Sequence, residues 1–283
     1  MTHRSRLALR PALTVAFLGA ALGPMGGHAQ ATNPEARLQA WDDHRRLEAE
    51  SPFRELEWRA VGPMQAGARV EAIAVPPGSH GVIYVGIGSG NLWKTENNGL
   101  SWDPIFEKES SFSIGDVAVS PSHPEVVWVG TGETQPRHSG YSYSGTGVFK
   151  STDAGATWQN AGLTDTHHIG KVLIHPTDPE VVYVAALGHF WSGNRERGVF
   201  RTTDGGTSWE QVLFVSEGTG AVDMAMDSYE SRVLLASAWE AVSGSPKEAG
   251  EESGIFRSTD GGETWAKVTD GLPSGPLGRI GLD

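Results

Sequence analysis

Side chains suited to ligand binding gather in three long polar segments of the sequence, 133–146, 188–197 and 239–253. Aromatic rings stack on apolar faces, while arginine and glutamate orient polar groups, so this mixture suits a sugar or an extended peptide. With one histidine from segment 164–168, the candidate ligand-binding residues are Glu133, Arg137, Tyr141, Tyr143, His168, Trp191, Arg195 and Trp239. A structural alternative stays open, in which Trp191 and Trp239 pack in the interior and Glu133 pairs with Arg137 to fix a loop.

Enzymatic chemistry at these segments would depend on carboxylates. Glycoside hydrolysis needs two positioned carboxyl groups. Four acidic residues are expected near the segments, and their spacing selects no pair: Glu133, Asp165, Glu196 and Glu240. The catalytic residues therefore stay unassigned.

No metal site and no cofactor are predicted from the sequence. His167 and His168 are adjacent, so their side chains would point apart on a strand. The chain has no cysteine, which excludes disulfides, thiol catalysis and thiolate metal sites.

Four copies of a short signature, Ser/Thr-x-Asp-x-Gly-x-Thr/Ser-Trp, divide the chain into repeats, with Asn97 in place of the aspartate in the first copy. The closing tryptophans, at positions 102, 158, 209 and 265, are 56, 51 and 56 residues apart. The Ser/Thr and Asp side chains can accept hydrogen bonds from nearby N–H groups, and the glycine permits a positive φ, so each signature predicts a turn with its tryptophan packed beneath it. The residues assigned this structural role are Asn97, Gly99 and Trp102; Asp153, Gly155 and Trp158; Asp204, Gly206 and Trp209; and Asp260, Gly262 and Trp265.

Short β-branched and aromatic runs precede each signature and read as strands. In the second repeat these runs are 114–119, 126–129 and 147–150, and in the third they are 169–174, 181–184 and 198–201. A fourth strand is expected to begin at each signature tryptophan. Four antiparallel strands in a repeat of this length are typical of a β-propeller blade. The sequence thus predicts an all-β propeller, with the long polar segments in the second-to-third loops of the blades, on one common face.

The signature resembles the Asp-box, or bacterial neuraminidase repeat, of sialidases, xyloglucanases and sortilin-type receptors. From residue 58 onward, about four-fifths of the chain resembles large secreted bacterial proteins of the glycosyl hydrolase and sortilin N-terminal-like type. The matching pieces are 92–95, 129–133, 147–153, 184–188 and 198–204. The resemblance implies a propeller that binds a polysaccharide or polypeptide on its long-loop face. The alternative that it implies is a xyloglucanase-like glycoside hydrolase with catalytic carboxylates partly outside this chain.

Two departures from these relatives bear on the alternatives. Xyloglucanases carry a carboxylate in the loop after the second strand of the first blade, and segment 86–91 has none. Sialidases carry an Arg-Ile-Pro element, which is absent here. These departures favour binding over hydrolysis.

The segment Leu277–Leu282 repeats the opening phrase of a blade, as in Ile114–Val119. We therefore expect about four blades and the start of a fifth, in an incomplete ring that joins further blades or self-associates.

The first 31 residues have the pattern of a cleavable secretory signal. Arg4, Arg6 and Arg10 precede an apolar run, and cleavage is expected after Ala31. Removing three arginines changes the formal net charge from −12 to −15, which disfavours nucleic acid and anionic membranes as partners. Three parts are predicted: the signal 1–31, a helical segment 32–57 with its helix over Asn33–Ala49 packed on the propeller, and the partial propeller 58–283. No membrane span is expected, and a secreted or periplasmic location is predicted.

Overall fold

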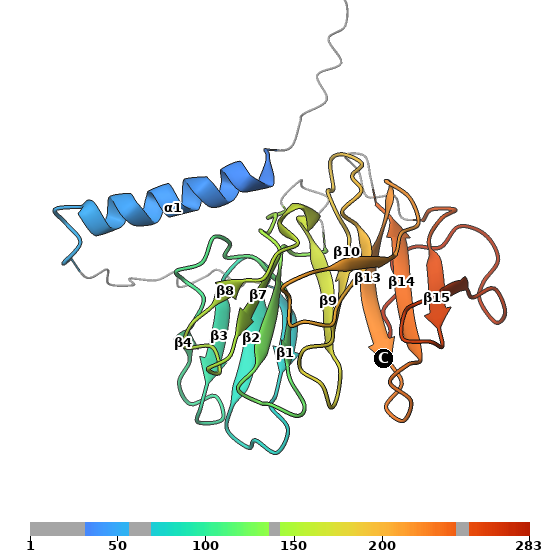
Figure 1. Ribbon diagram of the computed structural model, residues 1–283, viewed down its shortest axis with the longest axis horizontal. Helices are drawn as coiled ribbons and strands as arrows, with labels where there is room; N and C mark the ends of the chain where they lie inside the picture. The colour runs from blue at the N-terminus through green and yellow to red at the C-terminus, as the bar shows by residue number, and fades with distance from the viewer. Residues whose placement is uncertain (1–31, 57–68, 136–141, 242–248) are drawn as a thin grey trace, which may run out of the picture.

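The computed structural model describes residues 32–56, 69–135, 142–241 and 249–283. They form four separate four-stranded antiparallel sheets, in each of which the strands lie in chain order (Figure 1). The first two sheets contain β1 (Val70–Ala74), β2 (Ile83–Ile87), β3 (Leu92–Thr95) and β4 (Asp103–Pro104), and β5 (Ile114–Val119), β6 (Val127–Thr131), β7 (Val148–Ser151) and β8 (Gln159–Asn160). The last two contain β9 (Ile169–Ile174), β10 (Val182–Ala186), β11 (Gly198–Thr202) and β12 (Glu210–Leu213), and β13 (Thr219–Met226), β14 (Leu234–Glu240), β15 (Gly254–Ser258) and β16 (Ala266–Lys267).

The first strands of successive sheets neighbour one another, which makes the sheets consecutive propeller blades. β1 contacts β5, β5 contacts β9, and β9 contacts β13. Second-strand residues such as Val127 and Val182 are fully buried between the sheets. The predicted all-β architecture of four-stranded antiparallel blades is confirmed.

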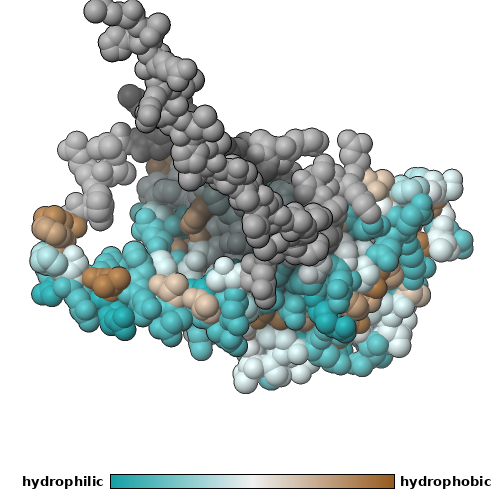
Figure 2. All heavy atoms as spheres, turned by 90° about the horizontal axis from the view of Figure 1, so that it is seen from above, coloured by the Kyte–Doolittle hydropathy of each residue, from teal (hydrophilic) through white to brown (hydrophobic). Residues whose placement is uncertain are grey.

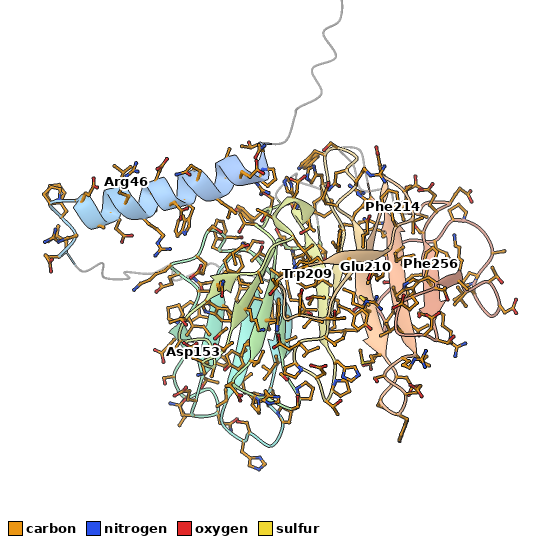
Figure 3. All side chains as sticks on the ribbon, in the orientation of Figure 1. Arg46, Asp153, Trp209, Glu210, Phe214 and Phe256 are labelled. Atoms are coloured by element: carbon orange, nitrogen blue, oxygen red, sulfur yellow. The ribbon has the colours of Figure 1, made fainter. Side chains whose placement is uncertain are left out.

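The signatures form the predicted turns, as the second copy shows. Ser151 Oγ accepts hydrogen bonds from the N–H groups of Asp153 (3.2 Å) and Gly155 (2.8 Å). The Asp153 carboxylate accepts hydrogen bonds from the Thr157 hydroxyl at 2.6 Å and from Thr157 N at 2.8 Å. These two bonds, the hydroxyl bond first, lower the pKa of Asp153 to about 2. Gly155 has a φ of 89°, which explains the glycine. Figure 3 shows Asp153 on the side of the sheets away from the helix.

The signature tryptophans connect neighbouring blades. Trp158 Nε1 donates to Ile105 O at 2.8 Å, and Trp209 Nε1 donates to Ala161 O at 2.7 Å, each in the preceding blade. An aromatic ring on the second strand of a blade also contacts the signature of the next blade: Tyr84 Oη donates to Ala154 O at 3.0 Å. Trp102 is 37 % exposed and packs less completely than predicted.

The helix predicted over Asn33–Ala49 is present as α1 (Pro34–Glu50), with Asn33 Oδ1 capping Glu35 N at 2.8 Å. It buries no residue fully, so the expected packing on the propeller is only partial: Leu38 and Trp41 are half-buried, and the helix contacts segment 164–166. Its surface is largely hydrophilic and its outer end extends away from the sheets (Figures 1 and 2), where Figure 3 labels Arg46. Its contact with the blades runs through Arg37, which donates to Gly145 O at 2.8 Å and to Thr164 O at 2.6 Å.

The segment expected to start a fifth blade, Leu277–Leu282, forms no regular strand, but it lies along the fourth blade. Ile280 O accepts from Ser237 Oγ at 2.7 Å, and Leu282 N donates to Asp223 Oδ2 at 2.9 Å. Asp116 Oδ2 accepts from Val172 N at 2.7 Å in the same manner between the second and third blades. Among the described residues, no helix is long and apolar enough to cross a membrane.

Candidate functional site

The loops at one end of the blades are joined by backbone hydrogen bonds into a continuous face, which we call the loop face. It contains the β2–β3, β6–β7, β10–β11 and β14–β15 loops and the connections between blades. Gly132 N donates to Ser113 O at 2.8 Å, Gly145 N to His167 O at 2.6 Å, and Leu187 N to His168 O at 2.8 Å. The long polar segments thus share a face, as the strand order requires.

Two glutamates and one arginine meet on this face. Arg69 forms ion pairs with both Glu71 and Glu133 and donates to Gln135 O at 3.1 Å. The Glu71 and Glu133 side chains are 4 % and 5 % exposed. A Cβ at Gly88 would lie 2.8 Å from Glu133 Oε2 and 3.0 Å from Glu71 Oε1, so this glycine makes room for both carboxylates.

Glu133 has an ion-pair partner that the sequence did not suggest. Its partner is Arg69, 64 positions earlier in the chain, while Arg137 lies outside the described residues. Sequence reasoning missed both Arg69, which directly precedes the first strand, and Glu71, which lies within it. Both carboxylates are buried and paired with one guanidinium. This arrangement favours a structural role over general acid–base catalysis.

A second arginine reaches this region from the C-terminal segment. Arg279 Nη2 donates to Thr134 Oγ1 at 3.1 Å. Burial lowers the pKa of Arg279, and the charges of Glu71 and Asp223 oppose that shift. The inner part of the loop face is therefore polar, with charges of both signs.

Exposed aromatic rings lie on three loops of the same face. Phe112 is 49 % exposed and Tyr143 is 41 % exposed, and their ring centroids are 5.0 Å apart at 61°. Trp191, in the β10–β11 loop, is 56 % exposed. Phe112 carried no prediction, because it stands in a short connection between blades. Tyr141, like Arg137, lies outside the described residues.

Two other candidates face the interior. Trp239 is 6 % exposed and packs in a cluster with Leu187, Phe190 and Val222, as the structural alternative predicted. His168 is 3 % exposed, and its Nδ1 lies 2.7 Å from Glu133 O. Burial lowers the pKa of His168 to about 3, so the ring is neutral and acts as part of the interior.

Arg195 is exposed, with its guanidinium 5.4 Å from the centroid of the Phe214 ring. Its neighbour Arg197 is fully buried and holds the β10–β11 loop, since its Nη2 donates to His189 O at 2.8 Å and its Nε to Asn194 Oδ1 at 2.9 Å. Burial lowers the pKa of Arg197 to about 10. Arg195 is thus available on the surface, while Arg197 shapes the loop that carries Trp191.

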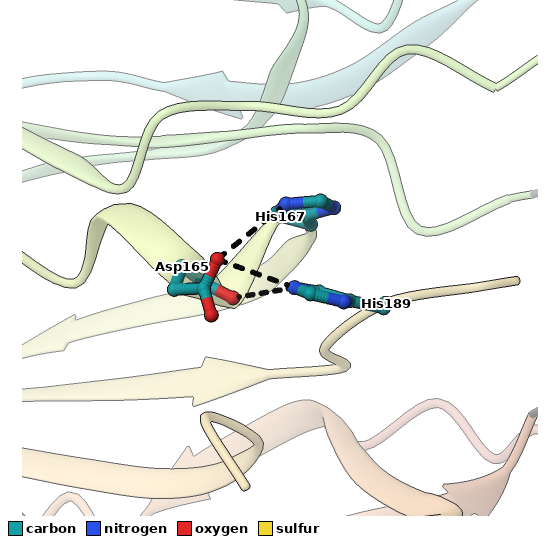
Figure 4. Close-up of side chains that lie close together, drawn as sticks. All are labelled: Asp165, His167 and His189. Carbon is teal, nitrogen blue, oxygen red and sulfur yellow. Dashed lines mark hydrogen bonds and ion pairs between the residues drawn. The ribbon is translucent and has the colours of Figure 1, made fainter. Parts of the chain in front are cut away.

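Asp165, His167 and His189 form a further cluster on the loop face (Figure 4). Asp165 belongs to the 3-10 turn η1 (Thr164–Thr166), His167 follows it directly, and His189 follows β10. Asp165 Oδ1 lies 3.7 Å from His167 Nε2 and 3.4 Å from His189 Nε2, and the imidazoles stack with centroids 3.7 Å apart. His167 ends the turn η1 and His168 precedes β9, so the two do not lie on a strand as expected, and sequence spacing missed the convergence of His167 with His189.

Comparisons with known proteins agree with this architecture. The family model for sortilin (neurotensin receptor 3) matches residues 146–274. A xyloglucanase from Paenibacillus sp is 26 % identical over 260 residues, which cover 82 % of this chain and 24 % of the relative. A xyloglucanase from Acetivibrio thermocellus is 25 % identical, with 71 % and 25 % covered. The chain thus spans about a quarter of the length of these curated relatives.

Two solved structures show the same fold. An ancestral GH74 enzyme aligns with a TM-score of 0.55 and 24 % identity over 72 % of this chain and 26 % of that chain. The GH74 xyloglucanase of Xanthomonas campestris aligns with a TM-score of 0.55 and 16 % identity over 77 % of this chain and 32 % of that chain. The chain is therefore an Asp-box repeat protein with propeller blades, similar to the sortilin family and to the GH74 xyloglucanases.

Proposed function

We propose that the loop face binds a polysaccharide and that the chain belongs to an exported, glycoside hydrolase-like propeller. The observation that carries this proposal is the set of exposed rings Phe112, Tyr143 and Trp191 on three loops of one face. Sugar rings present apolar C–H faces that stack on aromatic side chains, while their hydroxyl groups need polar partners. Arg195 is exposed in the same β10–β11 loop as Trp191 and can supply such a partner.

The similarity to xyloglucanases makes xyloglucan the first polymer to test. Sequence identity of about a quarter, over about a quarter of each relative, supports polysaccharide as the class of ligand but does not select one polymer. A polypeptide ligand, suggested by the sortilin match, is the competing outcome of the same test.

A hydrolase is the second candidate, favoured by the names of the curated relatives. Hydrolysis needs two carboxyl groups that reach the scissile bond. Within the described residues, the clustered glutamates Glu71 and Glu133 are buried and both paired with Arg69. The hydrolase proposal therefore places at least part of the acid–base machinery outside those residues.

Export rests on the sequence of the first 31 residues. Intact-mass measurement of protein recovered from the extracytoplasmic fraction tests it. A mature chain beginning at Thr32 is expected, and a chain retaining residues 1–31 in the cytoplasm would contradict export.

Affinity electrophoresis in gels containing xyloglucan, a soluble cellulose derivative or mannan tests the binding proposal. Retardation in at least one gel is expected, and Trp191→Ala and Tyr143→Ala should reduce it. Tyr229→Ala is the matched control, because Tyr229 is 99 % exposed in the β13–β14 turn at the opposite end of the blades. Equal retardation of all three variants, or none for the parent chain, would contradict the proposal.

A reducing-sugar assay on the same polymers separates binding from hydrolysis. Binding without release of reducing ends supports a binding propeller. Release of reducing ends that is abolished when the protein is heated beforehand supports the hydrolase. A peptide array in place of the polymers tests the polypeptide alternative, and saturable binding there without binding to any polymer would overturn the polysaccharide proposal.

A further inference from the structure

We propose that Asp165, His167 and His189 bind a divalent transition-metal ion of the zinc class. One potential ligand atom from each residue lies within 4.8 Å of the others. Zinc bonds of about 2.0–2.2 Å in a tetrahedral arrangement place ligand atoms about 3.4 Å apart. The 3.4 Å and 3.7 Å from Asp165 Oδ1 to the histidine Nε2 atoms are close to this value (Figure 4). The two imidazoles are stacked at 26°, so at least one of them must rotate to place both nitrogens on one ion.

The backbone holds the three residues together without help from an ion. Leu163 and His167, at the two ends of η1, have positive φ values of 54° and 58°. Non-glycine residues adopt this region at a cost, and such outliers concentrate at functional sites. On the other side, His189 N donates to Asn194 Oδ1 at 3.0 Å, and Arg197 holds His189 O. The ligands are therefore positioned in advance by two fixed loops.

The imidazole of His167 presents an unpartnered nitrogen to the cluster. Its Nε2 is buried and has no hydrogen-bond partner among the described residues. Buried polar atoms are normally satisfied, and a bound ion would satisfy this one.

Neighbouring groups can orient the other two ligands. His189 Nδ1 lies 3.1 Å from Ser192 Oγ, so a proton on Nδ1 leaves Nε2 free to bind the ion. Without an ion, the other tautomer of His189 lets Nε2–H donate to Asp165 O, which lies 3.1 Å away. Hydrogen bonds to the remote nitrogen of a ligand histidine are usual in metal sites.

Arg37 is the group that opposes a cation here. Its Nη2 lies 4.0 Å from Asp165 Oδ1. Its guanidinium is already directed at Gly145 O and Thr164 O, at 2.8 Å and 2.6 Å. An arginine at this distance can bond to the Asp165 carboxylate without contacting the ion. The three proposed ligands therefore stay available.

The donor set selects the class of ion. Two imidazole nitrogens and one carboxylate oxygen suit zinc and iron(II), and they leave at least one coordination position for water. Magnesium and calcium prefer oxygen ligands and should bind poorly. Bound zinc would connect the segment before β9 to the β10–β11 loop and thereby stiffen the loop face.

Titration calorimetry of the chelator-treated chain with zinc chloride tests the proposal. One zinc per chain is expected, with no saturable heat from magnesium. Asp165→Asn and His189→Gln should weaken zinc binding by at least about tenfold, since even outer-shell changes cost tenfold or more. His80→Gln and His123→Gln are matched controls, because both histidines are exposed in turns at the opposite end of the blades, and both should keep full affinity.

Cobalt(II) gives a second readout that depends on the ligands themselves. The intense visible absorption of a low-coordinate cobalt site is expected in the parent chain and in both controls, and it should be lost in Asp165→Asn. Circular dichroism of each variant confirms that it is folded, and Asp165→Asn preserves the size and shape of the side chain. Absence of saturable zinc binding, or zinc and cobalt binding unchanged in Asp165→Asn and His189→Gln, would overturn the proposal.

Discussion

Replacing Trp128 with alanine should separate the residues that hold the blades together from those that serve the loop face. Trp128 is fully buried on β6, with its ring centroid 6.0 Å from that of Trp209 at 89°. A Cβ at Gly206 would lie 2.7 Å from Trp128 Cη2, so the ring packs directly under the third Asp-box. Trp128→Ala would open a cavity between the second and third blades.

The expected cost follows from the burial and from one unsatisfied polar atom. A buried tryptophan covers roughly 200 Å², which at about 25 cal/mol/Å² gives an upper limit of about 5 kcal/mol. Trp128 Nε1 is buried with no hydrogen-bond partner among the described residues, and removing such a group recovers about 1–3 kcal/mol. We therefore expect a loss of about 3 kcal/mol in the free energy of unfolding, near the lower end for Trp→Ala.

Urea denaturation followed by far-ultraviolet circular dichroism measures this loss. With a slope of about 2 kcal/mol/M, the midpoint should fall by about 1.5 M. The control is Trp191→Ala, because Trp191 is 56 % exposed and its loss should change stability by no more than about 0.5 kcal/mol. A loss below about 1 kcal/mol for Trp128→Ala, or an equal loss for both variants, would refute the account of blade packing.

Three further predictions concern buried titratable groups and ion pairs. Arg69→Met should destabilise the chain by about 3 kcal/mol in urea, because Glu71 and Glu133 would stay buried without their cation; an unchanged midpoint would contradict this. Burial raises the pKa of Asp116 to about 6, so its contribution to stability is present at low pH and is lost as the pH rises through 6; Asp116→Asn should therefore reduce the fall in melting temperature between pH 4 and pH 7. Burial lowers the pKa of His168 to about 3, so protons below pH 6.5 favour the unfolded chain; thermal melts should show less acid destabilisation in His168→Gln than in the parent.

The repeats could be predicted from the sequence because their signals are local. The strands β5 and β9 have the bounds expected from their apolar runs, and the signature turns use side chains within four residues of one another. Ser151 and Asp153 bond to backbone groups of their own turn, which explains why a short motif suffices to specify it.

The sites could not be predicted because they depend on residues far apart in the chain. Arg69 and Glu133 are 64 positions apart, and His189 reaches His167 only after the β9–β10 hairpin returns the chain. The two candidate tryptophans differ for a related reason. β14 continues to Glu240 and keeps Trp239 inside the sheet, whereas β10 ends at Ala186 and leaves Trp191 in an exposed loop.

The helix shows the limit of periodicity as evidence. Leu38, Trp41 and Leu47 fall near one side of α1, which favoured packing on the propeller. Leu47 is 64 % exposed, and the helix buries none of its residues. Three large apolar residues in 17 supply too little surface to hold a helix against the blades without the polar contacts of Arg37.

Calorimetric titration of the chain with oligosaccharides cut from the polymer that retards it would test the central claim, that the loop face binds polysaccharide. We expect saturable binding that weakens by about tenfold in Trp191→Ala, since losing one stacked ring costs about 1.4 kcal/mol, and that is unchanged in Tyr229→Ala. Binding of equal affinity in Trp191→Ala and the parent chain would contradict the assignment of this face.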